Sequence, residues 1–209
     1  MASIIIPAHN EENYIEKTLE AVGDKQEVIV VCNGCTDKTF QVASKYNCKV
    51  FNIKDKGVSM ARNFGARQST SDPLVFLDAD IIVDKDTLDK IKDSDYDIGV
   101  TKVKPDVDKV LPKVLMSLKT KAHTLYGCSS GLIFCTKQIF DKIGGFDESL
   151  ELGEDGKFLR AARKIGNFGM VDAYVYNSMR RLEKVGYPKI IWFWIKHYFL
   201  KRKKYEVIR

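Results

Sequence analysis

Leu74-Val75-Phe76-Leu77-Asp78-Ala79-Asp80 is a short apolar run that ends in two carboxylates. An apolar run of this length is typical of a strand that is buried on both faces. Open α/β sheets bind ligands at the carboxyl ends of their strands, so both carboxylates are expected at such a rim. Asp78 and Asp80 offer the oxygen ligands that a divalent cation such as Mg2+ or Mn2+ prefers. The alternative is a polar strand ending, and the neighbouring segments bear on that choice.

Apolar runs and helical patterns alternate on the N-terminal side of this stretch. This β-α-β rhythm predicts a mainly parallel, Rossmann-like sheet with helices on both faces. The expected strands are Ser3–Pro7, Val28–Cys32, Lys49–Ile53 and the run that ends at Asp78, and the expected helices are Glu11–Val22 (with Tyr14 on its apolar face), Asp37–Tyr46 and Val58–Gln68.

The rhythm changes after Asp80, but the sequence shows no repeat and no linker. Residues 1–180 are therefore expected to form one domain, followed by a basic, aromatic-rich helical segment at residues 181–209. The expected helices are Thr87–Ile91, Val110–Leu125, Lys137–Ile143 and Glu154–Ile165, and the expected strands are Asp97–Lys104, Gly131–Cys135 and Gly169–Tyr176.

The composition is that of an ordinary folded protein, with 209 residues, 44% hydrophobic and 30% charged. The net charge of +6 is unevenly distributed, because residues 180–209 contain ten Lys/Arg and two Asp/Glu. The five cysteines include one C-x-x-C, Cys32 and Cys35, but no second pair for a zinc site. The run Ile4-Ile5-Ile6 is too short for a signal peptide, so a cytoplasmic location is expected.

Several well-known site types are excluded by the residues themselves. No G-x-G-x-x-G and no P-loop follows the first expected strand, where Ala8-His9-Asn10-Glu11-Glu12 stands instead. An EF-hand starting at Asp78 fails, because Ile82 and Val83 replace an oxygen ligand and the turn glycine. Three histidines suggest no Ser/His/Asp or Cys/His arrangement. The site type that remains compatible with the sequence is a carboxylate–metal site on an α/β sheet.

Five segments, in order, resemble family 2 glycosyltransferases of the GT-A fold. Their order and spacing over about residues 3–165 make the resemblance specific, although each is short. The segments are Ile4-Ile5-Ile6-Pro7-Ala8-His9-Asn10-Glu11-Glu12, Val31-Cys32-Asn33-Gly34-Cys35-Thr36-Asp37, Gly57-Val58-Ser59-Met60-Ala61-Arg62-Asn63-Phe64-Gly65, Phe76-Leu77-Asp78-Ala79-Asp80, and Gly144-Gly145-Phe146-Asp147-Glu148 with Gly153-Glu154-Asp155. Ser178-Met179-Arg180-Arg181 resembles a further element of some members.

The resemblance implies transfer of a sugar from a nucleotide-sugar to an acceptor hydroxyl, usually with inversion. By analogy, Asp80 binds a divalent cation (Mn2+ or Mg2+), and Asp78 contacts the ribose or supports the metal. Asp155 is then the general base, and Glu154 orients the acceptor or tunes Asp155. Without the resemblance, Glu154 and Asp155 would read as an acidic first helical turn.

The resemblance also implies the donor-binding residues. Two departures matter: Cys32-Asn33 replace the usual Asp-Asp, and Ile81 stands where many relatives carry a further Asp. The first departure leaves UDP- and GDP-linked donors both open, because Asn33 can donate and accept hydrogen bonds. The implied donor-binding residues are Pro7, His9, Asn10, Glu11, Asn33, Arg62, Asp78, Ala79, Asp80, Arg180 and Arg181, with only one of the two adjacent arginines expected on the diphosphate.

The C-terminal segment combines aromatic residues at 190–200 with Lys201-Arg202-Lys203-Lys204. It is too short to span a bilayer, and its composition suits a peripheral contact with the cytoplasmic membrane face. Such a contact would bring the site to a lipid-linked acceptor, while a free glycan acceptor also stays open. The alternative is a helix packed on the domain or on a second subunit of a homodimer. A nucleic-acid partner is not expected, because the basic patch is confined and matches no known module.

The sequence argues against two other classes of function. A catalytically silent module that binds a sugar nucleotide or a glycan would need no base, so the presence of Asp155 beside Asp80 argues against it. A nucleotidyltransferase should carry a glycine-rich, arginine-containing loop after the first strand, which is missing here. An enzyme of the glycosyltransferase class is therefore the expectation.

Overall fold

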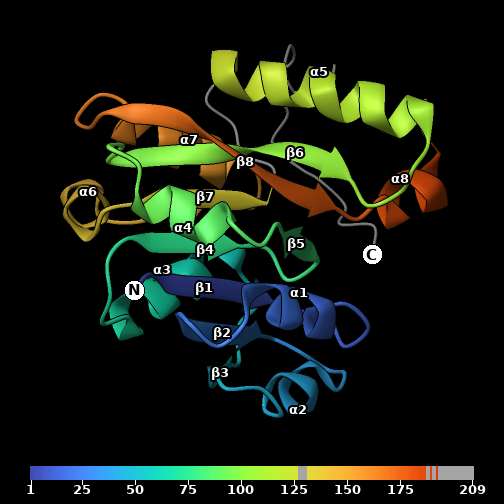
Figure 1. The fold of residues 1–209 in the computed structure, drawn as a ribbon. Coiled ribbons are helices and arrows are strands. Elements are labelled where there is room, and N and C mark those ends of the chain that lie inside the picture. Colours follow the sequence, from blue (N-terminus) through green and yellow to red (C-terminus); the bar gives the residue numbers. More distant parts are fainter. Residues whose placement is uncertain (127–130, 187–188, 190–191, 193–209) are drawn as a thin grey trace.

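The computed structural model describes residues 1–126 and 131–186, with Lys189 and Trp192 beyond them (Figure 1). The helices and strands of this part of the chain alternate as the sequence predicts, with one additional short strand. The strands are β1 Ser3–Ala8, β2 Glu27–Asn33, β3 Lys49–Ile53, β4 Leu74–Leu77, β5 Ile81–Val83, β6 Ile98–Pro105, β7 Leu132–Cys135 and β8 Phe168–Asn177. The helices are α1 Ile15–Val22, α2 Thr39–Ala43, α3 Val58–Gln68, α4 Thr87–Lys92, α5 Val110–Tyr126, α6 Lys137–Ile143, α7 Glu154–Ala162 and α8 Arg180–Val185.

The strands form one mixed sheet in the order β3-β2-β1-β4-β7-β6-β8-β5. Pairings within the β3-β2-β1-β4 half are all parallel, as predicted. In the second half, β7 runs antiparallel to both β4 and β6, β8 is parallel to β6, and β5 is antiparallel to β8. The predicted α/β class is thus confirmed, with a sheet that is parallel in its first half and mixed in its second.

Strand alternation divides the core into layers on the two faces of the sheet. Ile4 and Ile6 of β1 belong to a cluster with residues of α1 and α5, whereas Ile5 packs on the other face. That second face includes Ile98 and Val100 of β6 and is covered by α6 and α7. Figure 1 shows the strands stacked from β3 towards β6 and β8, with α5 beside the last two.

The short strand β5 is the element that the sequence reading missed. Its three residues are too few to show a periodic pattern, and its pairing partner β8 lies more than ninety residues later in the chain. The curled sheet brings β5 next to α1, where the Thr18 hydroxyl donates a hydrogen bond of 2.9 Å to the Ala79 carbonyl. The Asp78-Ala79-Asp80 segment is thereby fixed between β4 and β5.

Two boundaries differ from the expectations in ways that matter for the site. The first helix begins at Ile15 instead of Glu11, because residues 11–14 form a turn. The last helix of the predicted domain ends at Ala162, three residues before the expected Ile165. The aromatic and basic segment expected at 190–204 lies outside the described residues, apart from Trp192. Within the residues described, no helix has the length and apolar character needed to cross a membrane.

Candidate active site

Arg62 joins two acidic side chains that are far apart in the sequence. It lies in α3 with its side chain 8% exposed. One terminal nitrogen donates to Asp78 Oδ1 at 2.9 Å and the other to Glu154 Oε1 at 3.0 Å. The ring of Phe146 lies 5.1 Å from the guanidinium and packs beside it. The end of β4 and the start of α7 are therefore held together through one buried cation.

Arg180 makes the second bridge, at the start of α8. Its two terminal nitrogens bind both carboxylate oxygens of Glu11 at 2.9 Å, and one of them also reaches Asp80 Oδ2 at 3.0 Å. The guanidinium lies 3.9 Å from the centre of the Tyr14 ring, a cation–π contact. The turn at residues 11–14, which displaces the start of α1, supplies both Glu11 and Tyr14. Of the two adjacent arginines, Arg180 is thus at the site, and the side chain of Arg181 is outside the description.

The pKa values of these groups follow from burial and crowding. Burial and repulsion by Asp78 raise the pKa of Asp80 to about 6, although Arg180 opposes the shift. Burial also raises the pKa of Glu154, and the charge of Arg62 offsets only part of that rise. Burial works against both guanidinium charges, but the surrounding carboxylates prevail and raise the pKa of Arg62 and of Arg180. The site is a dense cluster of acids held by two permanent cations.

Asp155 lies beside this cluster, in the first turn of α7. Gly153, with φ +80°, turns the chain into the helix, a conformation that L side chains rarely adopt. The negative charge of Asp155 raises the pKa values of both Arg62 and Glu154, which places the three groups in one electrostatic environment. Asp155 Oδ1 accepts a hydrogen bond of 2.7 Å from the backbone N–H of Gly156.

The loops after β1 and β2 form the adjacent rim of the sheet. His9 Nδ1 lies 2.6 Å from the carbonyl oxygen of Asn33, and Asn10, with φ +57°, exchanges hydrogen bonds with Thr36. The buried Asn33 amide donates to the Ala8 carbonyl at 2.8 Å and accepts from the backbone of Gly57 at 3.2 Å. The Asn33 side chain therefore connects the backbone segments of this rim. The predicted contact of Asn33 with the donor base would have to come from its backbone, or its side chain would have to rearrange.

The remaining implied donor residues occupy the same end of the sheet. Pro7 lies within β1 and is buried, and Ala79 is buried between β4 and β5. Together with His9, Asn10 and Asn33, they lie at or near the carboxyl ends of parallel strands, as the sequence predicts. The structure thus collects the implied donor residues along one rim, while the roles assigned to them stay predictions.

The carboxylate oxygens of Asp78 and Asp80 fit a divalent cation that takes its remaining ligands from a substrate. Asp78 and Asp80 are one residue apart, and five carboxylates against two guanidiniums leave a formal charge of −3 on the cluster of Glu11, Asp78, Asp80, Glu154, Asp155, Arg62 and Arg180. In the described part of the chain, no group of three or more His, Cys, Asp or Glu side chains is arranged to hold a metal alone. Mg2+ commonly binds one or two carboxylates and takes its other ligands from phosphates and water.

Three residues were not assigned to the site from the sequence. Asn63 fastens α3 to the segment before α7, because its amide donates to the Phe146 carbonyl and accepts from the Phe146 N–H, each at 2.8 Å. Phe146 and Tyr14 lie against the two guanidiniums. Asn63 and Phe146 belong to the quoted motifs, and this membership is the sequence signal that could have placed them at the site. Tyr14 is expected on an apolar helix face, so the sequence offers no such signal for it.

Comparison with known proteins matches this chain to glycosyltransferases. The family model described as Glycosyl transferase family 2 matches residues 3–142. Poly(ribitol-phosphate) beta-N-acetylglucosaminyltransferase TarS of Staphylococcus aureus is 28% identical over 206 residues, covering 87% of this chain and 36% of that protein. An uncharacterized glycosyltransferase of Rickettsia typhi is 30% identical over 192 residues, covering 78% of this chain and 59% of that protein. The chain thus spans between about a third and three fifths of these relatives.

Solved structures of glycosyltransferases confirm the GT-A fold that the sequence predicts. The crystal structure of S. aureus TarS residues 1–349 matches with a TM-score of 0.71 and 25% identity, covering 85% of this chain and 60% of that one. The mannosyltransferase PcManGT from Pyrobaculum calidifontis, in complex with GDP-Man and Mn2+, matches with a TM-score of 0.65 over 83% of this chain and 56% of that one. At 20% identity the second likeness concerns the fold alone.

Proposed function

This chain belongs to glycosyl transferase family 2, a family of transferase enzymes, and on that premise we propose that it transfers a sugar from a nucleotide-diphosphate sugar to an acceptor hydroxyl. The observation that carries the proposal is the pair of arginine bridges, Arg62 to Asp78 and Glu154, and Arg180 to Glu11 and Asp80. These bridges hold the acids of the strand end and of the helix start in one acidic cluster.

Asp80 and Asp78 would hold a divalent cation at the end of β4. When bound, Mn2+ or Mg2+ supplies Lewis-acid stabilisation of the negative charge on the departing diphosphate. Arg180 pairs with Asp80, and its guanidinium has the geometry to bind phosphate oxygens when Glu11 and Asp80 turn to other partners. Arg62 is buried and stays engaged with Asp78 and Glu154, which suits a positioning role.

Asp155 would act as the general base of the transfer. The acceptor oxygen forms a bond to the anomeric carbon, its proton passes to the Asp155 carboxylate, and the bond from that carbon to the diphosphate oxygen breaks. Attack from the face opposite the leaving group inverts the anomeric configuration. Glu154, paired with Arg62, would hold the first turn of α7 so that Asp155 faces the acceptor.

The donor base and the acceptor are the finer parts of the proposal. Solved structures of TarS contain UDP or UDP-GlcNAc, and that of PcManGT contains GDP-Man, so uridine and guanosine donors are both included in the tests. The acceptor is a glycan or a lipid-linked glycan. Contact of residues 190–204 with the cytoplasmic membrane face and formation of a homodimer stay predictions from the sequence.

Substitution Asp155→Asn tests the proposed base. We expect the variant to lose roughly 10²–10⁴-fold in turnover, because a neutral amide cannot accept the acceptor proton, while nucleotide binding persists. Release of nucleoside diphosphate from UDP- and GDP-sugars measures turnover, and a thermal shift with the nucleotide and Mn2+ measures binding. Asp89→Asn, on the exposed surface of α4, is the matched control and should retain full activity.

Full turnover in Asp155→Asn would refute the assigned base. Nucleotide binding without turnover in the unmodified protein, across donors and acceptors, would instead favour the catalytically silent binding module.

A further inference from the structure

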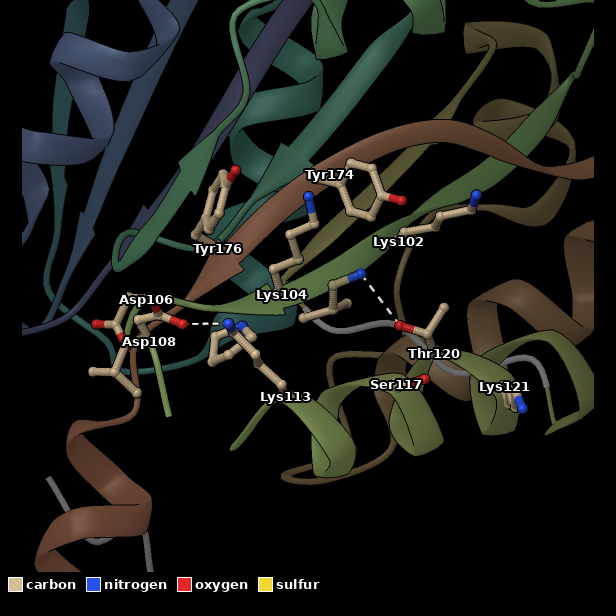
Figure 2. A pocket seen from close by; sticks show the side chains of 13 residues that line it. Lys102, Lys104, Asp106, Asp108, Lys113, Ser117, Thr120, Lys121, Tyr174 and Tyr176 are labelled. Atoms are coloured by element: carbon tan, nitrogen blue, oxygen red, sulfur yellow. Dashed lines mark hydrogen bonds and ion pairs between the residues drawn. The ribbon is translucent and has the colours of Figure 1, made fainter. Parts of the chain in front are cut away.

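A cavity of about 620 Å³ lies beside β6, between that strand, β8 and α5 (Figure 2). The pairing of β6 with β7 covers Ile98 to Val100 only, so among the described strands this edge of β6 is open beyond Val100, and the cavity extends along it. Four lysines and two tyrosines dominate the lining: Lys102, Lys104, Lys113, Lys121, Tyr174 and Tyr176.

The lysines and tyrosines of the strands form a regular array. In the register of β6 with β8, Lys102 is opposite Tyr174 and Lys104 is opposite Tyr176. The Lys104 ammonium lies 3.6 Å from the centre of the Tyr174 ring and 5.9 Å from that of Tyr176. Figure 2 shows the Lys104 side chain directed between the two rings.

Lys104 is a half-buried cation without a carboxylate. Within the described residues it makes neither an ion pair nor a hydrogen bond, whereas Lys102 pairs with Asp172 and Lys113 pairs with Asp108. A cation held by aromatic rings and lacking an anion is suited to accept one from a ligand. The lining as a whole carries four lysines against two aspartates, Asp106 and Asp108.

The array lies on the same face of the sheet as the proposed base. Ile98 and Val100 pack with Phe158 and Leu159 of α7, the helix whose first turn contains Asp155. The register of β6 with β8 shifts between Thr101 and Lys102, and beyond that shift Val103 belongs to the core on the opposite face. Its neighbours Lys102 and Lys104 therefore lie on the same face as Ile98 and Val100, beyond the end covered by this apolar cluster. Val103, between them, packs on the opposite face with Met116 of α5.

Strand pairing and a hydrogen bond also link the lysines and tyrosines to the end of the Asp78-Ala79-Asp80 segment. Tyr176 is opposite Ile82 of β5, two residues after Asp80, and Asp106 at the cavity accepts a hydrogen bond of 2.9 Å from the N–H of Met179, next to Arg180. The donor loops follow β1 and β2, on the other side of β4 and β7 in the sheet order. β4 and β7 thus lie between the cavity strands and the strands that the implied donor loops follow, and Arg180 reaches Glu11 of the first loop from the cavity side.

We propose that this cavity binds the phosphate groups of an anionic acceptor chain, with Lys104 and Lys102 as phosphate contacts and the two tyrosines packing against the carbon skeleton. The assignment rests on the proposed transferase function, because it makes the cavity the approach to Asp155. Its charge is opposite to that of the acidic cluster, so an anionic chain is attracted to the lysines and repelled from the metal-binding acids.

Binding of inorganic polyphosphate to the full-length chain tests the proposal, with neutral dextran as the uncharged probe. We expect the double substitution Lys102→Gln and Lys104→Gln to weaken polyphosphate binding at least about tenfold. The matched control, Lys90→Gln with Lys92→Gln on α4, removes the same charge from an exposed surface and should stay within about twofold of the unmodified protein. Lys104→Arg should restore most of the binding lost in Lys104→Gln, because the cation is retained.

Binding of UDP and GDP with Mn2+, measured on the same proteins, separates the two proposals. Nucleotide binding that persists while the Lys102/Lys104 variant binds polyphosphate as well as the control does would overturn the acceptor site alone. Loss of nucleotide binding in all proteins, with polyphosphate still dependent on Lys104, would count against the transferase instead. Tighter binding of a single-stranded DNA oligonucleotide than of polyphosphate would assign the cavity to nucleic acid and overturn the acceptor assignment.

Discussion

The two arginines of the site differ in how deeply they are buried and in how their charge is balanced. Arg62 is buried, and among the residues that the structure describes its Nε has no hydrogen-bond partner, so its charge depends on the two carboxylates that it bridges. Removing one member of such a buried network leaves an uncompensated charge. Arg180 is 31% exposed and binds Glu11 and Asp80 from the rim of the site. Arg62 is thus a fixed part of the scaffold, and Arg180 is the arginine placed to exchange partners.

The raised pKa of Asp80 predicts a specific pH dependence of stability. In the metal-free protein its pKa is about 6, against 3.8 for the ordinary group, so between these values the folded state binds more protons than the unfolded state. The contribution of Asp80 to the free energy of unfolding should therefore decrease as the pH rises from about 4 to about 6 and be constant above that. Urea denaturation at several pH values, with a chelator present, measures it.

Asp80→Asn is the comparison for this titration, because the amide cannot ionise. The difference in unfolding free energy between Asp80→Asn and the unmodified protein should grow in favour of the variant across that pH window. A difference that is independent of pH from 4 to 7 would show that Asp80 is not shifted.

At the scale of elements, α3 is the helix that the site depends on most. It carries Arg62 and Asn63 towards α7 and Phe146, and its position is fixed by close packing of Gly65 on β1 and β2. A Cβ at Gly65 would lie 2.5 Å from Cγ2 of Ile5 and 3.3 Å from Cγ2 of Val31. The helix can approach the sheet this closely only because residue 65 has no side chain.

Gly65→Ala should therefore destabilise the protein although alanine is the better helix former. We expect a loss of about 1–3 kcal/mol in the free energy of unfolding, since the clash outweighs the gain of roughly 1 kcal/mol in helix propensity. Gly57→Ala at the start of the same helix is the control, because its Cβ would meet Met60 at an ordinary 3.5 Å. Equal stability of the two variants in urea titrations would contradict the packing argument.

At the scale of the whole molecule, local patterns account for the elements but not for all of their pairing. The apolar runs before residue 80 predict the parallel half of the sheet, since β1, β2 and β4 are buried on both faces, while β3 is the partly exposed edge strand. The mixed half rests on pairings between distant segments, such as β5 with β8, and the three residues of β5 carry no periodic signal. Register and strand direction there depend on tertiary contacts that no local window contains.

The site follows the same division between local pattern and long-range contact. The quoted motifs predict which acids gather, because Asp78, Asp80, Glu154 and Asp155 belong to segments with a known order. They do not predict the bridges, since Arg62 and Glu154 are 92 residues apart and Arg180 and Glu11 are 169 apart. Likewise, Asn33 was expected to face the donor, but its short side chain satisfies backbone groups of the rim.

Two oppositely charged regions distinguish the two sides of the catalytic rim. The acidic cluster has a formal charge of −3, and the cavity beside β6 is lined by an excess of lysine. A cation brought in with the donor would neutralise the first, and an anionic acceptor would neutralise the second.

The central claim is that the arginine-bridged acids form a cation-dependent site for a nucleoside diphosphate. Calorimetric titration of UDP and of GDP into the full-length chain, with Mn2+ and then with excess chelator, tests it most directly. We predict that at least one of the nucleotides binds with Mn2+ and that chelation or Asp80→Asn weakens this binding by at least about tenfold. Binding of equal strength with chelator and in Asp80→Asn, or no binding of either nucleotide with Mn2+, would contradict the claim.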